Sequence, residues 1–362
     1  MRAFVWLAAF APFLAHRLPL AHRGAAGFDF PAIAALDGED LFWLAVVAVD
    51  GAWLIARRAR LAAALPLLAW LAVALAAAAR PDERTAKLRD GPREPGERAL
   101  FSPIGFGPEE SDWTLVMAPG VALPLPPSSR HWLGSDGQGR DLLARLLHGT
   151  RVSLGVGAAA TAIALAVGLM VGLLCGTLRG AVDLVLMRVV EVLLCFPHLF
   201  LVLIVFAYLP HSRTTMILLL GLVGWTTTAR LARGELLRLR DQEFVLAARS
   251  LGASPLRLAL RHLLPNALAP VLVAATFSVA GAMLAEFALS WLGLGVAPPT
   301  PSLGRILAEG QPLIARAPFL SLAPGLLIFA VVTSFNAWGE ALREATTPEF
   351  SASRQAAGGS AP

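Results

Sequence analysis

The residues with the greatest potential for chemistry are charged groups inside or beside long apolar runs. Arg188 and Glu191 are three residues apart within one such run, so on a helix they share a face and can neutralise each other. Asp50, Asp183 and Glu286 are further carboxyl groups in or near apolar runs. A proton relay would need a connected series of acids and histidines, whereas such groups usually face protein or water. We therefore interpret them as structural, with Arg188 and Glu191 as a candidate intramembrane ion pair.

A second cluster of polar residues lies in the glycine-rich stretch 134–141, GSDGQGRD. Asp136 and Asp141 could suggest calcium, but the EF-hand ligand pattern and its terminal glutamate are missing. We expect turns here, followed by an interfacial helix over 140–148 whose leucines (Leu142, Leu143, Leu146 and Leu147) face lipid. The sequence therefore predicts no metal site.

Motifs for covalent or nucleotide chemistry are missing from the sequence. A Walker A loop needs Gly-Lys-Ser/Thr, but the only lysine, Lys87, lies between Ala86 and Leu88. The sequence contains no HExxH and no GxSxG motif. Cys175 and Cys195 lie in separate apolar runs without nearby ligands, as buried small hydrophobic residues do. We predict no catalytic residues and no cofactor, and if ATP hydrolysis is required, another polypeptide must perform it.

The composition indicates which elements position these residues. Of 362 residues, 56% are hydrophobic and only 15% are charged, against about 25% charged in an ordinary soluble domain. A spanning helix needs about 20 mostly apolar residues. We predict an all-α, polytopic transmembrane bundle of about eight spans, near residues 3–20, 40–56, 61–79, 152–178, 182–209, 214–232, 266–290 and 319–340.

The positions of the arginines predict the orientation in the membrane. Arginines at 57, 58 and 60, and seven more within 230–262, mark cytoplasmic segments. Both termini then lie in the cytoplasm, and the polar segment 80–130 is periplasmic. The net charge of +5 is explained by these arginines beside apolar runs, so we expect no nucleic-acid binding. Residues 3–15 could alternatively be the core of a signal peptide.

Three glycines of the fourth predicted span, Gly168, Gly172 and Gly176, recur every four residues. A ridge of small residues lets two helices approach closely in lipid. The neighbouring helix can belong to this chain or to a second subunit, and the sequence leaves both possibilities open.

The stretch 241–265, DQEFVLAARSLGASPLRLALRHLLP, predicts two short helices joined at Gly252. Asp241 is a candidate N-cap for the first helix, whose Phe244, Ala247, Ala248 and Leu251 share one face. Gly252 supplies a left-handed stop, Ser254-Pro255 begins the second helix, and Leu264-Pro265 ends it. Neither helix is long enough to be stable alone. A groove on a partner could bury the apolar face, and the alternative is a loop lying on lipid headgroups.

These residues resemble the EAA loop of importer-type ABC permeases. Ala247-Ala248, Gly252-Ala253 and Leu264-Pro265 have the family's spacing, although Leu246 stands at the family's glutamate position and Glu243 lies one turn earlier. Further stretches are similar to dipeptide and oligopeptide permeases, in the order 131–157, 187–197, 285–304 and 335–348. The resemblance implies that the loop, within 235–265, is a coupling helix that docks on a cytoplasmic ATPase, with Glu243, Ala247, Ala248, Gly252, Ala253, Leu264 and Pro265 as its residues.

The resemblance also implies the domain organisation and partners. We expect N-terminal helices with the polar segment over 1–130, the permease core over 131–349 and a cytoplasmic, disordered tail over 350–362. The expected partners are a second permease subunit, two ABC ATPase subunits, a periplasmic or extracellular substrate-binding protein and membrane lipid. The expected role is a bacterial inner-membrane permease for peptides. The alternatives are nickel-chelate or glutathione-like cargo, or an ion-coupled secondary transporter that uses the intramembrane carboxylates.

Overall fold

The computed structural model describes residues 106–178 and 180–346, and a few short pieces before them: Ala11, Ala21–Gly24, Gly27–Asp29, Leu44, Arg98–Leu100 and Ile104. The predicted spans at 3–20, 40–56 and 61–79 therefore lie outside the described residues, apart from Ala11 and Leu44. The predicted tail at 350–362 also lies outside them.

The described residues belong to two compact units. The first unit comprises residues up to Leu154 and Pro298–Leu326. It contains α5 (Trp113–Val116), the start of α6 (Leu142–Leu178), α13 (Leu303–Gly310), the 3-10 turn η4 (Gln311–Leu313) and the start of α14 (Phe319–Thr346).

A small antiparallel sheet in the first unit was not predicted by the sequence analysis, so the chain is predominantly rather than entirely helical. Its order is β2-β1-β3, with β1 at Ala21–Gly24, β2 at Gly27–Asp29 and β3 at Arg98–Leu100. His22 of β1 lies opposite Asp29 on one side and Ala99 on the other. The pairing joins segments about 75 residues apart, and strands of three or four residues are too short to give a recognisable period-two pattern.

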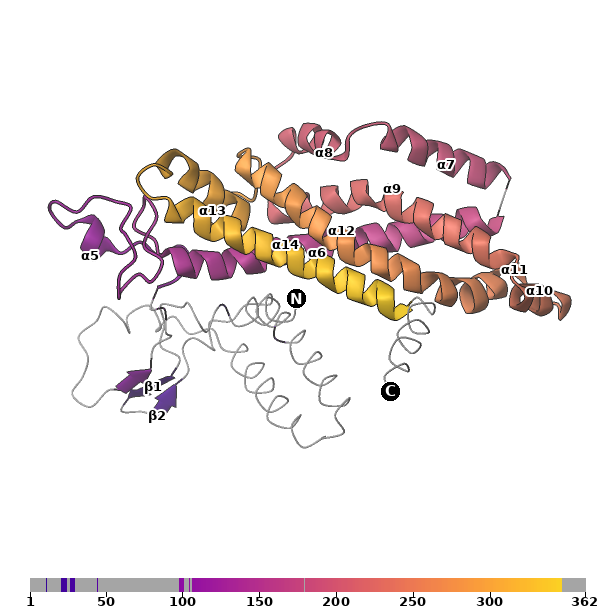
Figure 1. The fold of residues 1–362 in the computed structure, drawn as a ribbon, viewed down its shortest axis with the longest axis horizontal. Coiled ribbons are helices and arrows are strands. Elements are labelled where there is room, and N and C mark those ends of the chain that lie inside the picture. Colours follow the sequence, from indigo (N-terminus) through magenta and orange to yellow (C-terminus); the bar gives the residue numbers. More distant parts are fainter. Residues whose placement is uncertain are drawn as a thin grey trace, which may run out of the picture. The chain divides into compact units, whose positions relative to one another are not determined.

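The second unit comprises Gly155–Ala297 and the chain from Leu327 onward. Besides the rest of α6 and α14, it contains α7 (Ala181–Leu194), α8 (His198–Ala207), α9 (Arg213–Arg240), α10 (Glu243–Ser250), α11 (Pro255–Arg257), the π-helix η3 (Leu258–Leu263) and α12 (Leu264–Trp291). Within this unit α9 packs against α12, and α10 and α11 lie at the far ends of these two helices (Figure 1).

Four described helices are long and apolar enough to cross a membrane: Leu142–Leu178, Arg213–Arg240, Pro255–Trp291 and Phe319–Glu344. A fifth candidate is the pair α7 and α8, which is bent by 82°. Pro197 lies at this bend, where its missing N–H interrupts the helical hydrogen bonds. These five correspond to the last five predicted spans.

Helix α6 begins earlier than predicted. The predicted interfacial helix over 140–148 is continuous with the span, and its Leu142, Leu146 and Leu147 are buried in the protein rather than directed at lipid. Thirty-seven helical residues are about 55 Å long, well beyond the roughly 30 Å of a hydrocarbon core. The first turns of α6 are therefore free to pack against protein: a Cβ added at Gly149 would lie 3.2 Å from Ile306 Cδ1 and 3.3 Å from the Leu303 nitrogen.

Candidate coupling site

The predicted helix–glycine–helix element lies between the two long helices α9 and α12. Gly252 follows α10 with φ of +82°, the left-handed region that a residue without Cβ adopts at no steric cost. The Ala253 N–H donates to Ala248 O at 3.1 Å and the Gly252 N–H to Arg249 O at 2.9 Å, so the last carbonyls of α10 are satisfied. Ser254 then begins α11, accepting a hydrogen bond from the Arg257 N–H. The turn chemistry read from the sequence is therefore present.

Two predicted boundaries of this element are wrong. Asp241 is the C-cap of α9, and the N-cap of α10 is Gln242, which makes no side-chain cap hydrogen bond. Pro265 does not end a helix, because the chain continues as one helix over Pro255–Trp291. The missing N–H of Pro265 is accommodated in the first turn of α12, directly after the wider turn η3, where the Leu264 N–H donates to Ala259 O.

One side of the element is anchored in a hydrophobic cluster. Val245 of α10 is fully buried, although the face predicted from spacing did not include it. It packs with Leu236 and Leu239 of α9, Leu258 and Leu263 of η3, and Ala267 of α12. Ala248 and Ala253, two residues of the predicted coupling set, are partly buried against this cluster. The short helices are therefore held by α9 and α12 rather than by their own stability.

The other side of the element is apolar and exposed. Its large side chains are Phe244, Leu246, Leu251, Leu256 and Leu260, and Leu251 beside the glycine stop is 88% exposed. Of the remaining predicted coupling residues, Glu243, Ala247 and Pro265 are exposed and Leu264 is half-buried. Glu243 lies in the first turn of α10, where a negative charge is favourable to the helix dipole.

The three glycines of α6 lie against α9 of the same chain. A Cβ added at Gly168 would lie 2.5 Å from the Cβ of Thr228, one at Gly172 would lie 2.6 Å from the Cβ of Ala232, and one at Gly176 would lie 2.8 Å from the Cβ of Leu236. The sequence left open whether these glycines pack against a helix of the same chain or of a second subunit. In the structure they pack against a helix of the same chain. The close approach requires that these positions carry no side chain.

Arg188 and Glu191 form an ion pair on α7, with Nη1 2.8 Å from Oε2, and both side chains are more than half exposed. A stronger pair was missed: Arg233 of α9 donates from Nε and Nη2 to the two carboxylate oxygens of Asp183 on α7, at 2.5 and 2.7 Å. The two residues are 50 positions apart. Asp183 and the arginine-rich segment were visible in the sequence, but their pairing depends on the packing of α7 on α9.

A buried ionic cluster in the first unit was not predicted from the sequence. Arg145 of α6 is fully buried, and its Nη1 lies 2.5 Å from Asp136 Oδ2 and 2.6 Å from Glu309 Oε2. Arg140 contacts the same two carboxylates, and Arg305 contacts Glu309. Burial alone raises the pKa of Glu309, but hydrogen bonding and the charges of Arg145 and Arg140 hold it below its usual value. Glu309 thus remains an anion that ties α13 to the start of α6.

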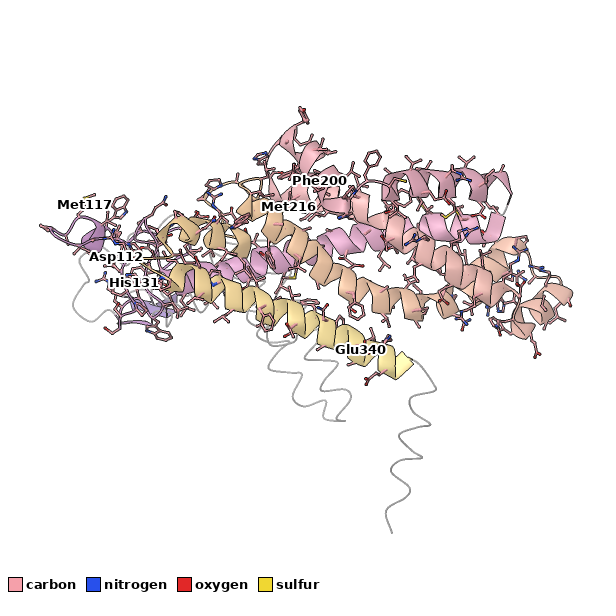
Figure 2. All side chains as sticks on the ribbon, turned by 45° about the horizontal axis from the view of Figure 1, so that its top comes forward. Asp112, Met117, His131, Phe200, Met216 and Glu340 are labelled. Atoms are coloured by element: carbon pink, nitrogen blue, oxygen red, sulfur yellow. The ribbon has the colours of Figure 1, made fainter. Side chains whose placement is uncertain are left out.

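A histidine joins two further carboxylates next to this cluster. His131 is buried; its Nδ1 lies 2.8 Å from Asp141 Oδ2 and its Nε2 lies 3.4 Å from Asp112 Oδ2 (Figure 2). Asp141 also accepts a hydrogen bond from the Ala144 N–H and so caps α6. The two aspartates considered for calcium are therefore held by arginine and histidine, and the described residues contain no group of acids, histidines and cysteines that could hold a metal ion.

The architecture and the helix–glycine–helix element at 241–265, the candidate coupling element, together define a helical, multi-pass membrane protein with two short surface helices between two of its spans. The sequence profile of the "binding-protein-dependent transport system inner membrane component" family matches residues 168–347. The oligopeptide transport system permease protein OppC of Bacillus subtilis is 37% identical over 252 residues, which are 70% of this chain and 81% of that protein. The chain belongs to this family: it is an inner-membrane permease, a non-catalytic subunit of an ABC importer.

Other proteins are also similar to this chain. The dipeptide permease DppC of Bacillus subtilis is 35% identical, covering 69% of this chain and 79% of that protein. The glutathione permease GsiD of Escherichia coli is 38% identical, covering 62% of this chain and 74% of that protein. An inward-facing structure of the MetNI methionine ABC transporter is similar at 20% identity and a TM-score of 0.49, covering 57% of this chain and 98% of that one. Importers of this family work with an ATPase and a substrate-binding protein.

Proposed function

We propose that this chain forms half of the translocation path of a peptide importer and that residues 241–265 transmit ATPase movements to it. The observation that carries the coupling role is the exposed apolar side of α10 and α11, opposite a side that is packed into α9 and α12. A partner bound to the exposed side could therefore move α9 and α12, because the element is packed against both helices. The element is too short to fold alone, so its rigidity comes from the Val245 cluster.

In this proposal the second half of the path is a similar permease subunit, and two cytoplasmic ATPase subunits close on each other when they bind ATP. The coupling element and both termini face the cytoplasm, and the first unit's polar loops face the substrate-binding protein outside. Closure would push the element and reorient the spans, so that cargo delivered outside is released inside. The chain itself performs no covalent chemistry.

Gly252→Val tests the coupling role. A Cβ at Gly252 would meet no atom within 4 Å, so the substitution acts through the backbone alone. A left-handed conformation costs about 1–2 kcal/mol for an L-residue, and more for a β-branched one. We expect co-purification of the ATPase and substrate-stimulated ATP hydrolysis to fall, the latter about tenfold, as for a coupling free energy of typical size. Gly252→Asn is the matched control, because asparagine tolerates this conformation. Assembly and stimulation that are unchanged in the valine variant would refute the docking role.

Peptide cargo is supported by the names of the relatives, two of which transport oligopeptides or dipeptides. Glutathione-like cargo is the second candidate, because GsiD is equally similar. The test is uptake of a labelled dipeptide by the assembled transporter in vesicles, with glutathione and a nickel chelate as competitors. We expect dipeptides and longer peptides to compete and the other two compounds to have no effect. Uptake that depends on an ion gradient rather than on ATP would contradict the whole proposal.

A further inference from the structure

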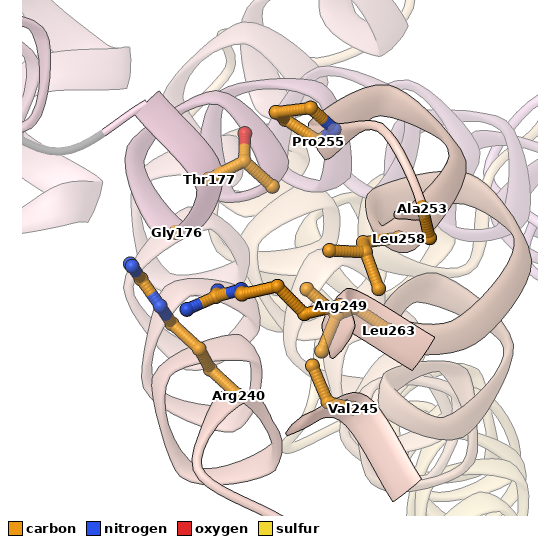
Figure 3. Close-up of a pocket in the computed structure, with 9 residues that line it drawn as sticks. All are labelled: Gly176, Thr177, Arg240, Val245, Arg249, Ala253, Pro255, Leu258 and Leu263. Atoms are coloured by element: carbon orange, nitrogen blue, oxygen red, sulfur yellow. The ribbon is translucent and has the colours of Figure 1, made fainter. Parts of the chain in front are cut away.

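A pocket of about 260 Å³ lies between the coupling element and the ends of α6 and α9, and none of the element's large exposed apolar side chains lines it. Val245, Leu258 and Leu263 form its apolar wall, and these are members of the cluster that anchors the element. Thr177, in the last turn of α6, also lines the pocket, and its hydroxyl donates to the Leu173 carbonyl oxygen at 2.6 Å. The pocket is therefore apolar on one side and polar on the other (Figure 3).

Two arginines from different helices define the charge of this pocket. Arg240 is the last residue of α9 and Arg249 is near the end of α10, and the Arg249 side chain extends toward the Arg240 side chain in the pocket (Figure 3). No carboxylate is among the described residues that line it. The Arg249 guanidinium makes neither a hydrogen bond nor an ion pair with any other described residue, unlike Arg233 and Arg238 of α9. Two like charges directed into one pocket are stabilised by an anion between them.

The position of the pocket indicates where that anion comes from. Thr177 and Arg240 lie at the ends of two helices that are long and apolar enough to span a membrane, Leu142–Leu178 and Arg213–Arg240. The ends of spanning helices lie at the level of the lipid headgroups. Basic pockets between spanning helices at this level bind phospholipid headgroups, and the guanidinium fork matches the geometry of phosphate oxygens.

We propose that this pocket binds the phosphate of an anionic phospholipid headgroup, held by Arg240 and Arg249. The phosphate would then bridge the end of α9 to α10, on the packed side of the element. The lipid composition of the membrane would thereby set how firmly the coupling element is attached to the spans. This site is separate from the exposed side that we propose for the ATPase, and its occupancy can be measured without transport.

The test is the binding of phosphatidylglycerol to the purified, delipidated full-length chain, measured as the thermal shift and by native mass spectrometry. Phosphatidylcholine and inorganic phosphate are the comparison probes. We expect phosphatidylglycerol to bind in preference to both, and the Arg240→Gln/Arg249→Gln variant to bind it roughly 30-fold more weakly, given the usual contribution of one arginine near a membrane surface. Arg238→Gln/Arg261→Gln is the matched control, because it removes one exposed arginine from α9 and one from η3 outside the pocket.

Equal binding of phosphatidylglycerol by the pocket variant and the wild type would overturn the proposal. Inorganic phosphate that saturates the site, with no preference for phosphatidylglycerol over phosphatidylcholine, would overturn the membrane source of the ligand. If the double variant does not fold, Arg249→Gln alone provides the test, because the Arg249 side chain is exposed and its replacement leaves the Val245 cluster intact. In that single variant we expect about fivefold weaker binding.

Discussion

Replacing Arg145 with methionine is expected to lower the free energy of unfolding by about 3–5 kcal/mol, the usual cost of removing one partner of a buried ion pair. Arg145 is fully buried, and its guanidinium lies within 2.6 Å of both Asp136 and Glu309. Methionine fills a similar volume, but Asp136 would then pair only with Arg140, and Glu309 only with Arg140 and Arg305. The free energy is measured by reversible denaturation of the purified chain in detergent, together with its yield in the membrane.

The matched control for this prediction is Arg188→Met. Arg188 also pairs with a glutamate, but its side chain is 71% exposed in the isolated chain, and exposed pairs contribute about 0–1 kcal/mol. Adding Glu309→Gln to Arg145→Met should restore part of the loss, since one of the unpaired carboxylates is then neutral. Equal, small losses for Arg145→Met and Arg188→Met would show that the buried cluster does not stabilise the first unit.

Gly172→Ala is expected to destabilise the chain by about 1–3 kcal/mol, the range for an over-packed interior. The added Cβ would lie 2.6 Å from the Ala232 Cβ and 2.9 Å from the Ala229 carbonyl oxygen. A carbonyl oxygen cannot rotate away as a side-chain tip can, so α6 and α9 must separate. Gly172→Leu should prevent accumulation of the folded protein. Thermal unfolding of the purified variants measures the first effect, and membrane yield measures the second.

Gly234→Ala is the control for the helix contact. Gly234 lies on α9, where an added Cβ would meet no atom within 4 Å. Alanine is a better helix former than glycine by about 1 kcal/mol, so this variant should be as stable as the wild type or more stable. The two glycine-to-alanine changes are therefore expected to differ in sign. A stabilising Gly172→Ala would contradict the close approach of α6 and α9.

Local chemistry was the most predictable part of the coupling element. The left-handed stop at Gly252 and the cap at Ser254 depend on the residues themselves and their immediate neighbours, and both are present. The N-cap at Asp241 was wrong because α9 continues through the arginine-rich stretch and ends at that residue. The buried position Val245 was missed because α9 and η3 decide which side of so short a helix is covered.

The polar residues were the least predictable part. Asp136, Arg140 and Arg145 are close in sequence, but Glu309, which joins them, is 164 residues from Arg145. The same applies to Arg233 and Asp183, 50 residues apart. A charge in the sequence shows that a partner is required, and only the packing of distant helices determines which partner it meets.

By itself the sequence determined that this protein is a membrane permease, because apolar runs of spanning length and an ordered set of local motifs do not depend on how the helices pack. It also determined that the three glycines of α6 form a ridge. Only the tertiary structure decided that this ridge faces α9 of the same chain, that the coupling element leaves one apolar side exposed, and that two arginines meet beneath it. These contacts join residues far apart in the chain, and their geometry is decided by side-chain packing between helices rather than by local preference.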